Sequence, residues 1–195
     1  MKPRIVLATR NAGKVRELQA LLGDLVEIES LEADVDETGA TLDENARIKA
    51  EAARLRSGEP GLGDDSGLEV AALDGRPGVR SARYAGESAT DADNIARLLH
   101  DLRGVSGRRR GARFRCVLAL CWPGEPLRTF EGVCRGRILE APRGAGGFGY
   151  DPVFEVPELG KSFAELAQKE KNRISHRGKA VALLRAWLAN RLAAK

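Results

Sequence analysis

The chain has 195 residues, of which 43% are hydrophobic and 31% charged, a composition typical of a globular protein with a sizeable core. Its longest apolar run, 116–122, is far shorter than the roughly 18 residues of a membrane span. We therefore expect no membrane protein, and the N-terminal apolar stretch is too short for a signal peptide. A net charge of +4 favours an anionic partner, either a nucleic acid or a phosphorylated small molecule.

The first part of the chain predicts two strands and two helices. An apolar strand at 4–8 precedes a helix in which Val15 and several leucines recur at helical spacing. A second strand is predicted at 26–28. Capping-box spacing at 41–44 then opens a helix that ends near Ser57.

The second part predicts a hairpin between helices. Thr90 caps a helix with an inward apolar face, and the segment 114–122 is apolar on both faces, as in a central strand. Its predicted hairpin partner is 127–133. Capping-box spacing at 162–165 opens a short helix, and an apolar stripe over 181–192 marks the last one.

The order of these elements indicates the fold class. Because a hairpin interrupts the alternation of strands and helices, a mixed α/β sheet fits better than strict βαβ repetition. The sequence has no repeat, low-complexity tract or long linker, so we interpret 1–195 as a single domain.

The cysteines indicate the compartment. Cys116 and Cys121 fall in one predicted strand at odd spacing, which puts them on opposite faces where they cannot bridge each other. With Cys134 the count is odd and no CxxC pair occurs. Reduced, buried thiols in a cytoplasmic protein are the expectation.

Two adjacent carboxylates, Asp64 and Asp65, stand between glycines just before the alternating apolar residues of a predicted strand. At a strand end two neighbouring side chains leave opposite faces, so one can point into a cleft and hold a cation. Magnesium takes oxygen ligands, usually one or two carboxylates with water and substrate phosphate. The pair therefore predicts either a charged, solvated turn or a magnesium site.

The turn between the first predicted strand and helix, 8–15, is a second candidate. A strand-to-helix turn that ends in Gly-Lys is typical of phosphate binders, which place backbone amides and an ammonium group there. It is not a P-loop, because Ala8 replaces the first glycine and Val15 replaces the Ser/Thr that would contact magnesium. The turn is either a phosphate site of another family or a plain helix cap by Asn11 with an exposed Lys14.

The segment 144–149 matches the dinucleotide-binding pattern GxGxxG letter for letter. Its context excludes that function, because Pro152 follows too closely for the required helix. Four glycines around Phe148 instead predict a flexible loop that presents the ring as a stacking surface for a base. The alternative is that Phe148 anchors the loop in the core.

Two segments concentrate basic residues. Four cations and His176 lie in 171–179, ahead of the last helix, where the helix dipole disfavours them unless an anion is bound. A solvated basic loop is the alternative there. The tract Arg108–Arg110 follows Gly107 between a predicted helix and a predicted strand, so we predict a solvated loop. Few aromatic residues lie nearby to stack RNA bases.

Acidic residues crowd around Thr38 and Gly39, upstream of the aspartate pair. Most of them must be ordinary surface charge, but one or two inside the site would complete a cation site with Asp65. The candidates for this second ligand are Asp34, Asp36, Glu37, Asp43 and Glu44.

Four motifs in order, 9–14, 64–67, 147–152 and 175–178, closely resemble the inosine triphosphate pyrophosphatase family. The likeness runs from Arg4 to Trp187, and the bacterial, homodimeric, magnesium-dependent form matches best. The resemblance implies an elongated, strongly curved mixed β-sheet flanked by helices, with two lobes around a nucleotide cleft. It also implies hydrolysis of ITP, dITP and XTP to the monophosphate and pyrophosphate.

The resemblance also implies a role for each motif residue. Asp65 would be a magnesium ligand and the proton acceptor for the attacking water, with Asp36 as the second ligand. Phe148 would stack on the purine, and Lys171, His176 and Arg177 would contact the phosphates and the oxygenated edge of the base. The full set expected to bind substrate is Thr9, Arg10, Asn11, Ala12, Gly13, Lys14, Ser66, Phe148, Gly149, Tyr150, Asp151, Lys171, His176 and Arg177.

The sequence departs from the family pattern at two positions. Arg10 stands where glycine or asparagine is usual, which should reshape the phosphate loop modestly. Asp36 stands where a metal-binding glutamate is common, so the second ligand is either Asp36 or Glu37. Two other functions stay open: a septum-formation-type nucleotide pyrophosphatase acting on other triphosphates, and an RNA-binding module that uses the arginine tract.

Overall fold

The computed structural model describes residues 2–31 and 35–193. Its helices are α1 (Ala12–Leu22), α2 (Leu42–Ser57), α3 (Asp91–Asp101), α4 (Gln168–Ile174) and α5 (His176–Ala193). Its strands are β1 (Arg4–Ala8), β2 (Glu27–Leu31), β3 (Gly61–Val70), β4 (Pro77–Gly78), β5 (Gly111–Cys121), β6 (Arg128–Ile138), β7 (Phe154–Val156) and β8 (Lys161–Ser162). Short 3₁₀ turns lie at Ala71–Leu73, Ser81–Arg83, Gly107–Arg109, Asp151–Val153 and Phe163–Glu165.

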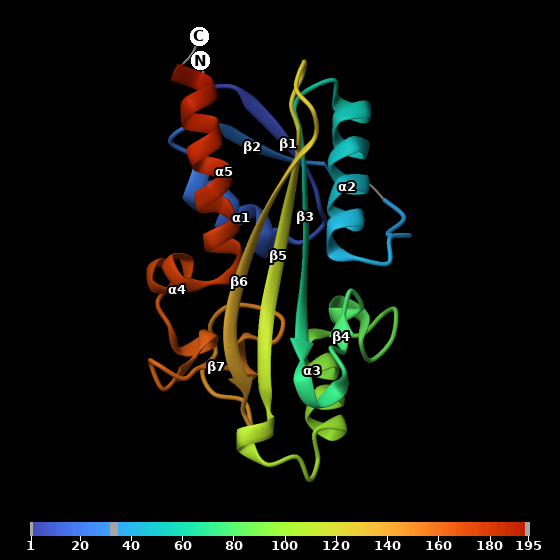
Figure 1. The fold of residues 1–195 in the computed structure, drawn as a ribbon, viewed down its shortest axis with the longest axis vertical. Helices are drawn as coiled ribbons and strands as arrows, with labels where there is room; N and C mark the ends of the chain where they lie inside the picture. The colour runs from blue at the N-terminus through green and yellow to red at the C-terminus, as the bar shows by residue number, and fades with distance from the viewer. Residues whose placement is uncertain (1, 32–34, 194–195) are drawn as a thin grey trace. The chain divides into compact units, whose positions relative to one another are not determined.

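The strands confirm the predicted mixed α/β class. Within the described residues they form an eight-stranded sheet in the order β2-β1-β3-β5-β6-β7-β8, with β4 paired to β3 (Figure 1). The strand β1 runs parallel to both β2 and β3, and such parallel pairs need the crossover connections that α1 and α2 supply. The pairs β3–β4, β6–β7 and β7–β8 are antiparallel.

The chain divides into two compact units. Unit 1 comprises the described residues of 1–65, 116–132 and 176–195, and unit 2 comprises 66–115 and 133–175. Each unit has its own buried apolar core. The long strands β3, β5 and β6 each contribute residues to both units, and the interpretation of 1–195 as one domain stays a prediction.

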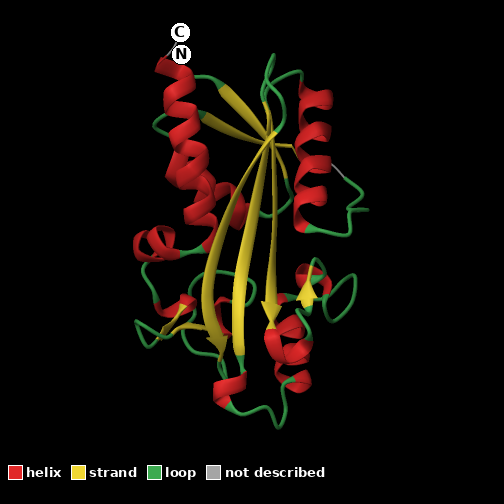
Figure 2. Cartoon of the chain, viewed as in Figure 1, coloured by secondary structure: helices red, strands yellow, loops and turns green. Residues whose placement is uncertain are grey.

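In unit 1, helices cover both faces of the strands, with α2 on one side and α1 and α5 on the other (Figure 2). Two glycines allow this close packing. A Cβ at Gly63 would lie 2.0 Å from the Ala46 carbonyl oxygen of α2, and a Cβ at Gly132 would lie 2.0 Å from the His176 carbonyl oxygen of α5. Any side chain at either position would push its helix off the sheet.

Most predicted helix starts are confirmed. Thr41 and Ser162 form the predicted capping boxes, and Thr90 caps its helix as predicted, also through a capping box. The helix that Thr41 caps ends at Ser57, and Gly58 follows with a φ of 74°, the left-handed conformation that favours glycine at a helix end. The segment after Ser162 forms only a single 3₁₀ turn, because Leu166 returns to an extended conformation.

Several boundaries differ from the predictions. The hairpin partner of β5 continues to Ile138, well past the predicted end at 133, and its last two residues pair with β7. The second strand extends to Leu31 because it pairs with β1 along its whole length. The helix α4 was not predicted, since its sequence QKEKNRI lacks an apolar face long enough to show helical spacing.

The arginine tract is a correction to the predicted solvated loop. Arg108 and Arg109 are exposed, but Arg110 is buried. The Arg110 guanidinium donates to the carbonyl oxygens of Leu102, Ile138 and Leu139 at 2.8–3.0 Å. It thus caps the C-terminal end of α3, where a cation is favoured by the helix dipole.

Two further expectations can be compared with the fold. None of the helices within 2–31 and 35–193 is both long enough and apolar enough to cross a membrane. The cysteines Cys116, Cys121 and Cys134 are free thiols. Cys116 and Cys134 are buried as expected, whereas Cys121 is only half-buried.

Candidate functional site

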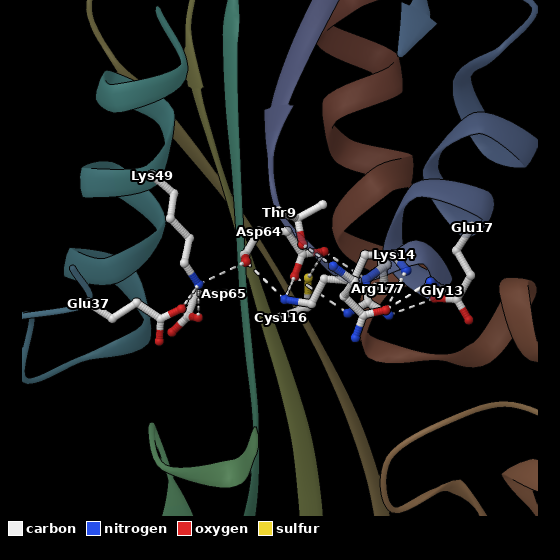
Figure 3. A network of polar contacts seen from close by, with 11 residues as sticks. Thr9, Gly13, Lys14, Glu17, Glu37, Lys49, Asp64, Asp65, Cys116 and Arg177 are labelled. Carbon is white, nitrogen blue, oxygen red and sulfur yellow. Dashed lines mark hydrogen bonds and ion pairs between the residues drawn. The ribbon is translucent and has the colours of Figure 1, made fainter. Parts of the chain in front are cut away.

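Asp64 and Asp65 lie inside β3, with their side chains on opposite faces of the strand. The prediction of opposite faces is confirmed, because Asp64 contacts residues of α1 and α5 whereas Asp65 contacts α2 (Figure 3). The prediction of a strand end is wrong, since β3 begins at Gly61. Pleating separates the two carboxylates, and cations on each face offset the repulsion that favours a solvated turn.

Asp64 is a completely buried carboxylate held by two cations. Its Oδ1 lies 2.6 Å from Lys14 Nζ, and its Oδ2 accepts from Arg177 Nε at 2.7 Å. Burial alone would raise the pKa of Asp64, but the charges of Arg177 and Lys14 outweigh it and hold the pKa far below its ordinary value. Asp64 is therefore ionised and anchors both cations.

Arg177 extends this network to α1. Its Nη1 donates to Glu17 Oε2 at 2.6 Å, so one guanidinium joins two buried carboxylates (Figure 3). Burial would lower the pKa of Arg177, but Asp64 and Glu17 raise it well above the ordinary value. Cys116 Sγ also lies 3.9 Å from Asp64 Oδ2.

Asp65, on the other face, shares one lysine with an upstream glutamate. Lys49 Nζ of α2 lies 2.6 Å from Asp65 Oδ1 and 2.7 Å from Glu37 Oε1. Burial raises the pKa of Asp65 above its ordinary value, although Lys49 and Lys14 act in the opposite direction. The other carboxylate oxygen, Asp65 Oδ2, is buried and makes no hydrogen bond within the described part of the chain.

These carboxylates fit a magnesium ion. Asp65 Oδ2 is a buried acceptor that the described residues leave unsatisfied, and Glu37 brings a second carboxylate to the same lysine. One or two carboxylates are what magnesium usually takes from a protein. No group of three potential ligands forms within the described ranges, where this place offers two carboxylates.

The other acidic candidates lie elsewhere. The side chain of Asp36 is exposed, whereas its neighbour Glu37 is half-buried and paired with Lys49. Asp43 pairs with Arg47, and Glu44 serves the cap of α2. Asp34 lies outside the residues that the structure describes.

The turn before α1 combines a helix cap with a charged link to Asp64. Asn11 Oδ1 accepts from the backbone N–H of Gly13 and Lys14 at 2.8 and 3.1 Å, which confirms the cap. Thr9 Oγ1 accepts from Asn11 N at 3.1 Å. The Lys14 side chain is only 14% exposed and donates to the Asp64 carbonyl oxygen, so it is not the exposed lysine of a plain cap. Arg10 and Ala12 are exposed.

Unit 2 contains the glycine-rich segment, and we call residues 147–151 the Phe148 loop. A 3₁₀ turn, not an α-helix, follows it, in agreement with the exclusion of a dinucleotide-binding motif. Phe148 is half-buried, and Lys171 Nζ lies 4.8 Å from the centroid of its ring, a cation–π contact. Asp151 Oδ2 accepts from both Lys171 Nζ, at 2.7 Å, and Phe148 N, at 2.9 Å.

Two members of the loop have anchoring contacts of their own. The buried Tyr150 donates its hydroxyl to the Ser81 carbonyl oxygen at 2.8 Å, and burial raises the pKa of this phenol. The Gly149 amide donates to Asp91 Oδ2 at 2.6 Å. Tyr150 thus fixes the loop to the core of unit 2 through its side chain.

The remaining predicted residues divide between the units. His176 and Arg177 are buried at the start of α5 in unit 1, where Arg177 pairs with carboxylates. Lys171 is buried in unit 2, paired with Asp151, and Ser66 is half-buried there. The structure therefore joins Lys14, Asp64 and Arg177 in one network and Phe148, Asp151 and Lys171 in another.

Lys49 and Glu17 belong to these charge networks but to none of the predicted motifs. Both lie on inward faces of their helices, Lys49 beside Ala46, Ala50 and Ala53 of α2. A charged residue on the apolar face of a helix is the signal that could have identified them, because such a charge needs a buried partner.

Comparison with known proteins places the chain in a family. The family model described as the Ham1 family matches residues 5–187. The dITP/XTP pyrophosphatase of Geobacillus kaustophilus (strain HTA426) is 59% identical over 186 residues, which cover 92% of this chain and 91% of that protein. The dITP/XTP pyrophosphatase of Methylococcus capsulatus (strain ATCC 33009 / NCIMB 11132 / Bath) is 55% identical over 192 residues, 94% of this chain and 95% of that protein.

Solved structures agree with this assignment. The Ham1 protein of Staphylococcus aureus superposes with a TM-score of 0.86 at 41% identity, covering 96% of this chain and 99% of that one. A HAM1 protein from Coxiella burnetii gives the same TM-score and the same coverage of both chains at 45% identity. The matched fold and the length of the family match show that this chain belongs to the Ham1 family.

Proposed function

We propose that this protein hydrolyses the non-standard purine nucleoside triphosphates ITP, dITP and XTP to the monophosphate and pyrophosphate. The names of its relatives support this activity. The observation that carries the proposal is the buried Asp65, whose Oδ2 is left unsatisfied by the described residues and whose Oδ1 pairs with Lys49. Such a carboxylate is suited to take a proton from water during cleavage of a phosphoanhydride.

The residues of unit 1 supply the chemistry at the phosphates. Asp65 would accept the proton of the attacking water, and its raised pKa suits a general base. Lys14, held at the N-terminal end of α1, would stabilise negative charge that develops on the leaving pyrophosphate. Asp65 and Glu37 would hold the magnesium ion, which supplies further positive charge to the phosphate oxygens.

Residues of unit 2 would provide the stacking surface for the base. Phe148 would stack on the purine, with Lys171 beneath the ring. A 6-oxo purine has a hydrogen-bond acceptor where adenine has an amino donor. A donor aimed at this edge therefore binds hypoxanthine by a hydrogen bond that adenine cannot form. The assignment of that donor to His176 or Arg177 stays a prediction, and the ratio of ITP to ATP turnover in an Arg177→Ala variant decides it.

A nucleotide panel tests the activity directly. Purified protein would be incubated with ITP, dITP, XTP, GTP, ATP and pyrimidine triphosphates, with magnesium and without it. Monophosphate and pyrophosphate would then be quantified. Preference for the 6-oxo purines is expected, whereas preference for pyrimidine or modified triphosphates would favour the septum-formation-type alternative. Salt-dependent RNA affinity with no turnover would favour the RNA-binding alternative.

A homodimer and a cytoplasmic location are also part of the proposal. Both rest on the resemblance to the bacterial enzymes of this family and, for the location, on the free thiols. Light scattering coupled to size-exclusion chromatography would measure the mass of the assembly against the 21.0 kDa of one chain.

A further inference from the structure

The conformation of the Phe148 loop depends on hydrogen bonds that two carboxylates accept from its backbone. Both residues that flank Phe148 are glycines, Gly147 and Gly149, with φ values of 76° and 59°. Because glycine has no side chain, neither residue restricts its own backbone to one conformation. A stacking ring on such a backbone is useful only if the peptide groups around it are held. Hydrogen bonds to those peptide groups therefore decide where the ring points.

Both peptide groups that flank Phe148 donate to a carboxylate. The N–H of the preceding peptide group, that of Phe148 itself, donates to Asp151 Oδ2 at 2.9 Å. The N–H of the following peptide group, that of Gly149, donates to Asp91 Oδ2 at 2.6 Å. Fixing both peptide planes fixes the direction of the Cα–Cβ bond between them, from which the ring extends.

Among the described residues, Asp91 takes no part in the capping box of α3. It is the first residue of α3, but the cap of that helix is made by Thr90 and Asp93, which form a capping box. Asp91 is exposed, so it does not complete the core. Its carboxylate reaches 58 positions along the chain to Gly149 in a hydrogen bond strengthened by its charge.

We propose that Asp91 is a positioning residue that holds the Phe148 loop in the conformation that stacks a purine. The proposal rests on the proposed function, since it assigns a base to Phe148. Stacking is present in the bound substrate and in the transition state alike, so loss of Asp91 should raise KM and leave kcat nearly unchanged. The competing explanation is that the negative charge of Asp91 stabilises the N-terminal end of α3 through the helix dipole. That explanation requires no contact with Gly149.

Three variants separate these explanations. Asp91→Ala removes the acceptor, Asp91→Asn removes the charge but keeps an acceptor oxygen, and Asp93→Ala is the matched control that weakens the same helix turn without a loop contact. KM and kcat for ITP, thermal stability and inhibition by inorganic tripolyphosphate would be measured for each. Tripolyphosphate has no base, so it reports the phosphate end alone.

For Asp91→Ala we expect a KM for ITP raised about five- to tenfold, the range for one ordinary, solvent-exposed hydrogen bond, with tripolyphosphate inhibition unchanged. Asp91→Asn should restore a near-wild-type KM, whereas Asp93→Ala should lower the melting temperature only. An unchanged KM in Asp91→Ala would overturn the proposal. The proposal would also be overturned if Asp91→Ala weakened inhibition by tripolyphosphate as much as it raised the KM for ITP. An equal rise of KM in Asp91→Asn would overturn it too, because the effect would then depend on the charge and not on the hydrogen bond.

A second measurement does not depend on the activity. Amide hydrogen exchange at Gly149 should be faster in Asp91→Ala than in the wild type and in Asp93→Ala. Unchanged exchange would overturn the contact itself. A wild-type protein without ITP hydrolysis would instead refute the proposed function, whatever the exchange at Gly149.

Discussion

Arg177 and Asp64 are 113 positions apart in the sequence, and in the structure Arg177 Nε donates to Asp64 Oδ2 at 2.7 Å. The same guanidinium binds Glu17, so one side chain of α5 neutralises carboxylates of both β3 and α1. This contact links the strand that carries Asp65 to the helix that carries Lys14. The charges of the candidate site are therefore part of the packing of unit 1.

Removal of Arg177 should destabilise the protein. Arg177→Ala leaves Asp64 and Glu17 as buried carboxylates with one cation fewer, a loss of about 3–5 kcal/mol for a broken buried pair. Chemical denaturation of the variant measures this loss. Arg185→Ala is the matched control on the same helix, since Arg185 pairs with an exposed aspartate. Equal stability of the two variants would contradict the prediction.

Asp65→Asn should abolish turnover and preserve the fold. The amide keeps an acceptor for Lys49 but cannot take a proton, so we expect the rate of ITP hydrolysis to fall by a factor of about a hundred or more. Asp64→Asn is the matched comparison, because it should lose thermal stability as well by weakening the pairs with Lys14 and Arg177. More than about a tenth of the wild-type rate in Asp65→Asn would move the base role elsewhere.

Lys49→Met should make stability depend on magnesium. The variant keeps the apolar stem but leaves Asp65 and Glu37 without their shared cation, which costs about 3 kcal/mol in the absence of a metal. Magnesium should restore more of the melting temperature than it adds to the wild type, because two unpaired carboxylates bind a divalent cation more tightly. Arg47→Met, exposed on the same helix, is the control. An equal magnesium response in both variants would exclude Asp65 and Glu37 as the ligands.

Gly63→Ala should separate α2 from the strand. Its Cβ would lie 2.0 Å from the Ala46 carbonyl oxygen, so the helix that carries Lys49 must move, at a cost of about 1–3 kcal/mol or more. Both stability and ITP hydrolysis should fall. Gly107→Ala is the control, since a Cβ there meets no atom within 4 Å. A wild-type melting temperature in Gly63→Ala would show that the packing tolerates a methyl group.

Acid should weaken the contact between α5 and the turn that follows α1. Arg185 Nη1 donates to Asp24 Oδ1 at 2.5 Å, which lowers the pKa of Asp24 from 3.8 to about 2. Because the folded-state pKa is depressed, this stabilisation is present above pH 3.8 and is lost as the pH falls toward 2. The free energy of unfolding should therefore depend less on pH between 4 and 2 in Asp24→Asn than in the wild type. Identical pH dependence would contradict the contribution of this pair.

Local sequence rules determined much of this protein. Thr41, Thr90 and Ser162 mark helix or turn starts because a capping box is completed within four residues. The opposite orientation of Asp64 and Asp65 follows from the two-residue period of an extended chain. The order of four short motifs was enough to indicate the family that the comparison established.

Only the tertiary structure decided which charges meet. Two aspartates between glycines favour a turn locally, but pairing of β3 with its neighbours in the sheet makes them part of a strand. The second carboxylate near Asp65 is Glu37 and not Asp36, because Lys49 reaches it from a helix that Gly63 lets approach. Arg177 is likewise buried because a glycine, Gly132, lets its helix α5 pack closely on the sheet. Burial and partners that are distant in the sequence set the pKa of a carboxylate, and the residues next to it in the sequence reveal neither.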